Sequence, residues 1–498
     1  MSGSEELYGV EVEKVIDNGD NLIGPVLIRN GSNNKPPQIS GVEGIFQSGD
    51  EKLIHRIMSL ISNTKEILCI SSFLIQRSDI TSEIQKCHQR GVRVYVLTAG
   101  EVQVSDPMYY EDSDQEERKE ASRELLNDLG DQAQIKTGNN LHSKFIISDP
   151  KTNPRAIVLT SNLTVRALNE NLELAVELSG TSAIELFRQF IIGFWVVAAR
   201  ILSKPEKNES SLKATKNHPE FAKTKYVPTE IKWTVNDQDL IKSRILEMID
   251  ISKESISISA WTIISSHPVA IKLLERAKMG VKVTVFTRPH KDNLEFIKQL
   301  ISYGGIVYCH NLLHGKSLIV DDKLGLIMTA NISKLGLDEG FETAVILKKQ
   351  QTEVLKKIHD EWKARATYAS SFQTRLKDIT KPWIDLNKEL TDINPPKAVK
   401  KRNLGKIRVS NIVDYFNRNL VVPKESETHD SVLTKYKAIL LPPVLPKNAE
   451  EKKVSYNTSL KIYARGNQNY VCIKNKNELD EAKKVSNELK AMIVFQVQ

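Results

Sequence analysis

Apolar and polar positions follow the same order in two successive stretches of the chain. Residues 53–61 and 240–249 have the apolar spacing of an amphipathic helix, and each precedes a short apolar run, at 65–73 and 253–261. A further helical stretch follows, then a glycine and a valine-rich run that begins at Gly91 or Gly280. Helix, glycine and valine-rich strand indicate β-α-β units. The pattern therefore predicts an α/β fold of two similar halves, each with mixed, mostly parallel strands covered by helices.

Breaks in this pattern predict five segments. Residues 203–224 are rich in Lys, Ser and Asn and are bounded by Pro205 and Pro219, as in a linker. Strand-like runs before residue 43 predict a hairpin packed on the body. Strand-like and helical runs after residue 457 predict a small α+β appendage. The expected boundaries are 1–43 for the N-terminal hairpin, 44–202 and 228–370 for the halves, 203–227 for the linker, and 371–498 for the C-terminal region.

The first half is longer than the second between its glycine and its histidine. Gly91 and Gly280 are 189 residues apart, whereas His142 and His314 are 172 apart, so the first half holds 17 additional residues. They fall near 101–118, a stretch rich in Asp and Glu. We expect a solvated surface loop there, with a lid or an autoinhibitory mimic of substrate as the alternative.

Charge and cysteine content narrow the functional classes. The chain has 70 basic and 62 acidic residues, a net charge of +8, in which residues 371–498 contribute +10 and residues 1–370 contribute −2. That basic region suggests a polyanionic partner. The four scattered cysteines argue against a disulfide framework or a cysteine zinc site. The polar N-terminus and the shortness of the longest apolar run, at 190–199, predict a cytoplasmic protein without integral membrane association.

A short motif occurs once in each half. His142-Ser-Lys144 is followed by Asp149, and His314-Gly-Lys316 is followed by Asp321 at the same spacing. Each copy then leads into a strand and a Thr-x-Asn turn. The turn residues are Thr160 and Asn162 in the first half and Thr329 and Asn331 in the second. Two copies of such a spacing are hard to obtain by chance.

These residue types suit the cleavage of a phosphodiester. The anionic diester repels nucleophiles, so charge around its oxygens must be neutralised during displacement. Lys144 and Lys316 supply cations, and Asn162 and Asn331 supply neutral amide donors. Imidazole titrates near neutrality, so His142 and His314 can act as nucleophile, acid or base.

At these residues the chain resembles the phospholipase D superfamily, and most closely its soluble prokaryotic nuclease-type members. The superfamily pattern is His-x-Lys-x4-Asp followed by Gly-Ser-x-Asn, and the resemblance covers roughly residues 44–370. Both copies carry an apolar residue, Leu159 or Met328, at the place of the glycine, and Thr at the place of the serine. The first copy has three additional residues between its aspartate and asparagine.

The resemblance implies a mechanism and roles for these residues. One histidine, with His142 favoured although the symmetry does not decide it, attacks phosphorus to give a phosphohistidine, and the other serves as acid and then base. Glu173 and Glu342 are the candidates that hold the far nitrogens of the histidines. Asp149, Asp321, Thr160 and Thr329 support the site without touching substrate. The resemblance implies no cofactor and no metal, and it places one site between the halves. A monomer would suffice for that site, while a dimer stays open.

Three hypotheses about the function remain at this point. The first is a nuclease that cleaves DNA or RNA, and the others are a phospholipase D or phosphatidyltransferase acting on lipids and a non-catalytic nucleic-acid-binding scaffold. In the nuclease hypothesis basic residues after 396 contact phosphates. They are Lys397, Lys400, Lys401, Arg402, Lys406 and Arg408. Because the chain has no Walker-type ATP-binding motif, such a nuclease would depend on a separate helicase or ATPase partner.

Overall fold

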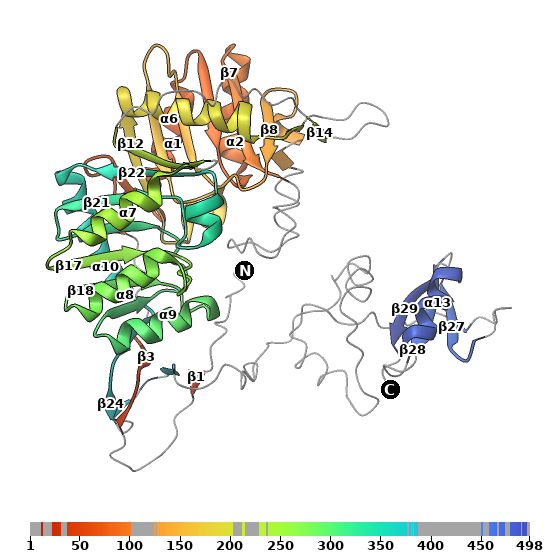
Figure 1. The fold of residues 1–498 in the computed structure, drawn as a ribbon. Helices are drawn as coiled ribbons and strands as arrows, with labels where there is room; N and C mark the ends of the chain where they lie inside the picture. The colour runs from red at the N-terminus through yellow and green to blue at the C-terminus, as the bar shows by residue number, and fades with distance from the viewer. Residues whose placement is uncertain are drawn as a thin grey trace. The chain divides into compact units, whose positions relative to one another are not determined.

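The computed structural model describes residues 11–12, 22–30, 37–100, 124–125, 127–202, 212–214, 229–235, 238–375, 378–379, 381, 383–386, 450–451, 458–465, 468–473, 479–489 and 491–495. The chain forms two compact units, Met1–Glu389 and Leu390–Gln498. Figure 1 shows the fold of both. The candidate site residues that the structure describes all belong to the first unit.

The first half is built on a nine-stranded sheet. Its strands run in the order β14 (Leu212–Ala214), β13 (Arg200–Leu202), β8 (Gln134–Gly138), β7 (Arg93–Ala99), β5 (Ile67–Ser71), β9 (Phe145–Ser148), β10 (Arg155–Leu159), β12 (Leu174–Ser179) and β4 (Ile45–Gln47). The histidine motif lies between β8 and β9, and the Thr-x-Asn turn follows β10.

The second half repeats this arrangement within a twelve-stranded sheet. Its central strands run in the order β19 (Ile306–Cys309), β18 (Lys282–Thr287), β17 (Ser255–Ser259), β20 (Ser317–Val320), β21 (Leu324–Met328), β22 (Glu342–Leu347) and β15 (Ile231–Val235). Here the histidine motif lies between β19 and β20. The predicted mixed α/β fold of two similar halves is therefore confirmed.

The expected predominance of parallel strands is wrong. In these two sheets the parallel pairs are β5–β7, β7–β8, β17–β18 and β18–β19, and the remaining pairs are antiparallel. Parallel neighbours need a long crossover, which the helices after β5 and β17 supply. After each histidine motif the chain instead turns back within a few residues, so β9 pairs antiparallel with β10 and β20 with β21.

Helices cover the outer face of each sheet. In the first half these are α1 (Glu51–Ser62) and α2 (Ser78–Gln89), and in the second α7 (Leu240–Asp250), α8 (Pro268–Lys278) and α9 (Lys291–Ser302). The α1 helix begins where the Asp50 carboxylate accepts the backbone N–H of Lys52. Its residues Leu53, Ile57 and Ile61 recur at helical spacing and are buried in the core, as the sequence pattern predicts.

Two further helices lie in a core that both halves share. They are α6 (Thr181–Ile192) and α10 (Lys349–Arg365). One cluster of buried residues joins Phe190 of α6 and Trp362 of α10 to Val158 of the first sheet and Ile327 of the second. Because this cluster is continuous, the halves pack directly on one another and their histidine motifs come together.

Among the described residues before position 43, the strands pair with segments that follow the second half and not with one another as in the expected hairpin. Strand β3 (Val26–Arg29) pairs with β23 (Tyr368–Ser371) and β25 (Trp383–Asp385), and β1 (Glu11–Val12) pairs with the other edge of β25. These segments extend the second sheet, because their exposed backbone groups find partners in residues that follow that half.

The second unit is the predicted small α+β appendage. Its four strands run in the order β26 (Glu450–Glu451), β27 (Lys461–Arg465), β28 (Gln468–Ile473) and β29 (Ala491–Phe495), with helix α13 (Leu479–Leu489) between β28 and β29. In the described part of the whole chain, every helix is too short or too polar to cross a membrane.

Candidate active site

Each histidine loop is anchored to the opposite half of the molecule. The backbone N–H of His142 donates to the carbonyl of Phe341 at 3.1 Å, and that of His314 donates to the carbonyl of Leu172 at 3.0 Å. Phe341 and Leu172 directly precede the two candidate glutamates in the sequence. The pseudo-symmetry of the halves therefore places each histidine beside the glutamate of the other half.

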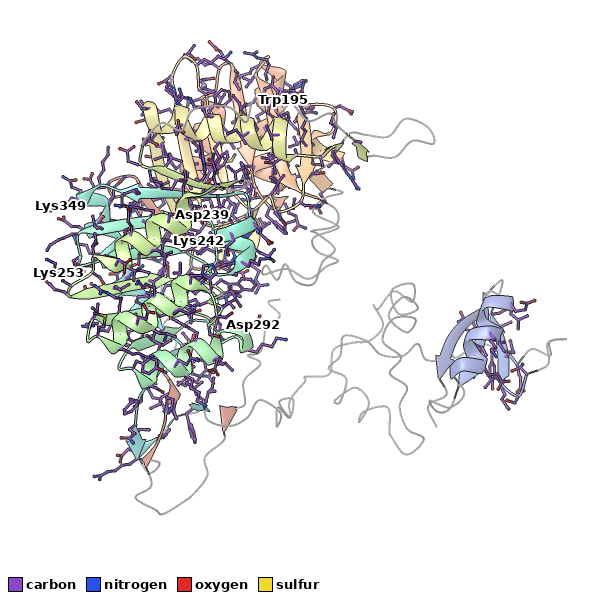
Figure 2. All side chains as sticks on the ribbon, viewed as in Figure 1. Trp195, Asp239, Lys242, Lys253, Asp292 and Lys349 are labelled. Carbon is purple, nitrogen blue, oxygen red and sulfur yellow. The ribbon has the colours of Figure 1, made fainter. Side chains whose placement is uncertain are left out.

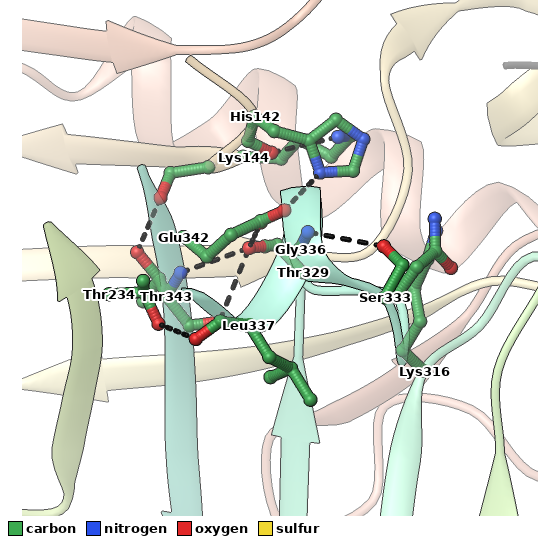
Figure 3. Close-up of polar contacts among 12 residues, drawn as sticks. His142, Lys144, Thr234, Lys316, Thr329, Ser333, Gly336, Leu337, Glu342 and Thr343 are labelled. Atoms are coloured by element: carbon green, nitrogen blue, oxygen red, sulfur yellow. Dashed lines mark hydrogen bonds and ion pairs between the residues drawn. The ribbon is translucent and has the colours of Figure 1, made fainter. Parts of the chain in front are cut away.

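Both histidines contact a buried carboxylate at the same ring nitrogen. His142 Nδ1 lies 2.7 Å from Glu342 Oε1, and His314 Nδ1 lies 2.7 Å from Glu173 Oε1. Figure 3 shows the first of these pairs. An ionised carboxylate only accepts, so Nδ1 of each ring carries a proton and donates it to the glutamate. Nε2 of each ring is thus left for attack as a nucleophile or for carrying the proton of a general acid.

The two threonines hold these carboxylates in place. Thr160 Oγ1 donates to Glu173 Oε2 at 2.5 Å and accepts the backbone N–H of Leu174. Thr329 Oγ1 likewise donates to Glu342 Oε2 and accepts the backbone N–H of Thr343. Each threonine therefore acts on a histidine only through the glutamate of its own half, which contacts the histidine of the opposite half.

The two lysines are fully buried and lie against their own histidines. Lys144 Nζ donates to the backbone carbonyl of His142 at 2.8 Å. Lys316 Nζ lies 2.9 Å from His314 Nε2 and 3.1 Å from His314 Nδ1. One lysine ammonium group at the backbone of His142 and one at the imidazole of His314 provide the cations that a phosphate group would need.

The asparagines occupy corresponding turns but have different surroundings. Asn331 Oδ1 accepts the backbone N–H of Thr262 at 3.4 Å. Asn162 is buried and lines a pocket of about 650 Å³ together with Glu173 and His314. The other walls of this pocket come from the first half. The pocket thus leads to His314, which is supplied by the second half.

The aspartates of the motifs organise the backbone at the far ends of the strands. Asp149 accepts the backbone N–H groups of residues 65–67, and Asp321 accepts those of residues 253–255. Burial pushes the pKa of Asp321 upward, but these three backbone N–H groups outweigh that effect and hold the pKa below its usual value. Both aspartates also adopt left-handed φ angles, 45° and 50°.

Two aromatic residues beside the histidines were missed in the sequence analysis. The ring of Phe73 lies 5.8 Å from that of His142, and the ring of Trp261 lies 6.0 Å from that of His314. Both follow the first parallel strand of their half, so the repeat itself held a signal for them. Both aromatic rings restrict the orientation of the imidazoles by packing against them.

A buried arginine and a short π-helix were also missed. Arg288 Nε donates to the carbonyl of Leu313, directly before His314, at 2.7 Å. The π-helix η3 (Leu335–Glu339) joins Asn331 to Glu342 and is held by an ion pair of 2.6 Å between Asp338 and Lys242. Lys242, labelled in Figure 2, also pairs with Asp239. These contacts join distant segments, so local sequence carries no sign of them.

Two predictions concern segments outside the described residues. They are the acidic insertion at 101–118 and the basic residues Lys397, Lys400, Lys401, Arg402, Lys406 and Arg408. Both stay predictions from sequence.

Comparison with known proteins identifies a family for both halves. The family described as cardiolipin synthase, PLD-like domain, matches residues 57–195 and 245–365, together more than half of the chain. Cardiolipin synthase A of Buchnera aphidicola subsp. Baizongia pistaciae (strain Bp) is 27% identical over 156 residues, which cover 29% of this chain and 31% of that relative. The chain thus matches less than a third of the length of this relative.

Solved structures give weaker likenesses. Phosphatidylserine synthase of Haemophilus influenzae Rd KW20 has a TM-score of 0.45 and 12% identity, covering 72% of this chain and 91% of that one. Nuc from Salmonella typhimurium, a phospholipase D family member, has a TM-score of 0.25 and 17% identity, covering 28% of this chain and 97% of that one. TM-scores below 0.5 assign neither a fold nor a function.

Proposed function

This chain belongs to the family described as cardiolipin synthase, PLD-like domain, and we propose that it cleaves and forms phosphodiester bonds through a phosphohistidine. The observation that carries this proposal is the paired contact of His142 with Glu342 and of His314 with Glu173, both at Nδ1 and both 2.7 Å long. It leaves Nε2 of each ring on the side away from the carboxylate, so that one Nε2 can attack phosphorus while the other carries and transfers a proton.

The proposed reaction has two displacements. In the first, Nε2 of one histidine, His142 in our assignment, forms a bond to phosphorus while the bond to the leaving alcohol oxygen breaks. The other histidine, His314, gives its Nε2 proton to that oxygen. In the second, His314 takes a proton from water or an alcohol, whose oxygen attacks phosphorus and displaces His142. Lys144 and Lys316 offset the charge on the phosphoryl oxygens, since Lys316 Nζ adjoins the imidazole of His314 and Lys144 Nζ lies at the backbone carbonyl of His142.

We propose a lipid phosphodiester as the substrate, so the protein would act as a phospholipase D or a phosphatidyltransferase. The expectation from sequence was a nuclease. The family and the curated relative are both described as cardiolipin synthases, and they favour the lipid hypothesis. A nuclease stays the second candidate because residues 371–498 carry a net charge of +10.

The test compares substrates under one condition. The full chain would be incubated in EDTA with phosphatidylglycerol vesicles, with labelled single- and double-stranded DNA and RNA, and with bis-p-nitrophenyl phosphate. We expect turnover of the lipid and of the small diester without added metal. Cleavage of nucleic acid but not of lipid would establish the nuclease instead. Loss of all cleavage in EDTA that Mg²⁺ restores would contradict the two-histidine mechanism.

Variants of His142 and His314 test the roles proposed for the two histidines. His142→Ala and His314→Ala should each lower turnover of bis-p-nitrophenyl phosphate by roughly 10²-fold or more, because general acid–base and nucleophilic groups contribute on this scale. His88→Ala, at an exposed position of α2, is the matched control and should retain full turnover. A phosphoryl adduct trapped on His314 and never on His142 would reverse the two roles.

A further inference from the structure

A buried polar network lies beneath the second histidine motif. His359 of α10 is buried, and its Nε2 lies 2.9 Å from Ser317 Oγ while its Nδ1 lies 2.8 Å from Ser257 Oγ. Ser317 Oγ in turn lies 2.7 Å from Ser259 Oγ. The network therefore ties α10 to β17 and β20 at the residue that directly follows Lys316.

In the first half aromatic packing takes the place of the contact between Ser317 and His359, while Ser71 keeps a hydroxyl that donates to the carbonyl of Ser143. In the register of the strands, Phe145 pairs with Ser71 as Ser317 pairs with Ser259. Phe145 packs edge-on against Phe190 of α6, with ring centroids 6.3 Å apart. The first half shows that this fold accepts two aromatic side chains where the second half has Ser317 and His359. Burying polar groups costs free energy unless their hydrogen bonds compensate for it. The polar network in the second half is therefore not a requirement of the fold.

The ring of Trp362 completes the support of this motif. It stacks on His359 with centroids 5.5 Å apart, and its Nε1 donates to Gln47 Oε1 of the first half at 2.9 Å. A Cβ atom at Gly315 would lie 2.7 Å from the Trp362 ring, so the indole also packs directly under Gly315. Residues 315 and 317, which flank Lys316, are thus both fixed by α10.

We propose that His359 is a positioning residue for Lys316 and His314. Side chains alternate along a strand, so Ser317 faces α10 while Lys316 faces the site. Holding Ser317 fixes the rotation of this segment and with it the 2.9 Å contact between Lys316 Nζ and His314 Nε2. That ammonium opposes protonation of the imidazole and neutralises a bound phosphate. The catalytic role of Lys316 rests on the proposed function, whereas its placement by His359 does not.

The test uses His359→Leu, which removes both hydrogen bonds, and His359→Gln, whose amide can still reach Ser317. Leu355→Ala on the same helix is the matched control, because Leu355 is fully buried and makes no polar contact with this network. With bis-p-nitrophenyl phosphate, His359→Leu should lower kcat about tenfold and change KM less than twofold. The basic limb of its pH–rate profile, which reports deprotonation of the acid His314, should move to higher pH, and His359→Gln should restore most of kcat.

Binding of inorganic phosphate to each folded variant, measured by calorimetry, separates the two proposals. We expect His359→Leu to bind phosphate more weakly than the wild type, and Leu355→Ala to bind it equally well although it is less stable. Absence of turnover by the wild type on every diester would overturn the proposed function, and the phosphate affinities would still decide the positioning role. An unchanged pH–rate profile and phosphate affinity in His359→Leu, or the same changes in Leu355→Ala, would overturn the role of His359.

Discussion

At the scale of single residues, the site depends on which nitrogen of each imidazole carries the proton. The carboxylates of Glu173 and Glu342 fix this proton on Nδ1 from the opposite half of the molecule. They are themselves fixed by Thr160 and Thr329. The chemistry of the histidines is thus set by residues that need not touch substrate.

Replacing Glu342 by Gln tests this dependence. A glutamine amide can donate to Nδ1 of His142 and so favour the tautomer whose Nε2 is protonated, which has no lone pair for attack. We expect kcat for bis-p-nitrophenyl phosphate to fall on the order of 10²-fold. Glu353→Gln, at an exposed position of α10, should retain wild-type kcat. Equal activity of Glu342→Gln and wild type would show that the carboxylate does not set the tautomer.

The residue between histidine and lysine differs between the halves for a steric reason. Ser143 Oγ lies 2.9 Å from Thr343 Oγ1, whereas a Cβ at Gly315 would lie 2.7 Å from the Trp362 ring. Gly315→Ser should therefore lower the free energy of unfolding by about 1–3 kcal/mol through overpacking. Ser143→Gly, which loses a hydrogen bond without a clash, should lower it by about 1 kcal/mol. Denaturant unfolding of both variants measures this, and a Gly315→Ser variant as stable as the wild type would contradict it.

At the scale of elements, a neutral histidine ties α10 to the sheet of the second half. Burial lowers the pKa of His359 to about 3. An imidazole in the unfolded chain titrates near ~6.5. Between these values the unfolded state binds a proton that the folded state excludes, so stability is fully present above the unfolded pKa and falls as the pH drops below it.

The expected pH dependence can be measured directly. From pH 7.5 to pH 5, His359 should reduce the free energy of unfolding by at most about 1.4 kcal/mol for each pH unit below the unfolded pKa. Glutamine does not titrate, so the free energy of unfolding of His359→Gln should fall less steeply with decreasing pH. The difference in slope should correspond to the one proton that His359 binds on unfolding. Burial, with Arg365 and Arg288 nearby, also lowers the pKa of His310 to about 4, but that group contributes equally to both proteins. If the free energy of unfolding changed with pH in the same way in wild type and His359→Gln, His359 would not have the lowered pKa described here.

At the scale of the whole molecule, the candidate site exists only where the halves meet. Each half supplies a histidine, a lysine and an asparagine, and each supplies the glutamate that the other half needs. The shared hydrophobic core around α6 and α10 holds the halves in this relation. One chain can therefore complete one site.

The basic C-terminal region gives a prediction about partners. Changing Lys397, Lys400, Lys401, Arg402, Lys406 and Arg408 to neutral residues should weaken binding of a polyanion and flatten its salt dependence, because fewer counterions are released. Cleavage of bis-p-nitrophenyl phosphate should be unaffected. Binding to DNA and to anionic vesicles, measured against salt, distinguishes a nucleic-acid partner from a lipid one. No change in either affinity would indicate a solvated linker.

The sequence alone determined the duplication and the α/β class, and it predicted the candidate histidines and glutamates that the structure brings into contact. Helical and strand periodicity are local properties, and the spacing of each motif fixes which side chains flank one strand. A repeat also implies that equivalent residues occupy equivalent places, which is why Glu173 and Glu342 could be chosen as a pair. Which strand lies beside which depends on residues far apart in the sequence. The expected predominance of parallel pairing was wrong for that reason.

Only the tertiary structure decided which residues of one half contact which residues of the other. His142 and Glu342 are 200 positions apart, and His314 and Glu173 are 141 apart, so no sequence pattern indicates that each carboxylate contacts the histidine of the opposite half. The same holds for Trp362 under Gly315 and for His359 under Ser317. Such contacts depend on how two packed surfaces meet, which is set by the side chains of both halves together.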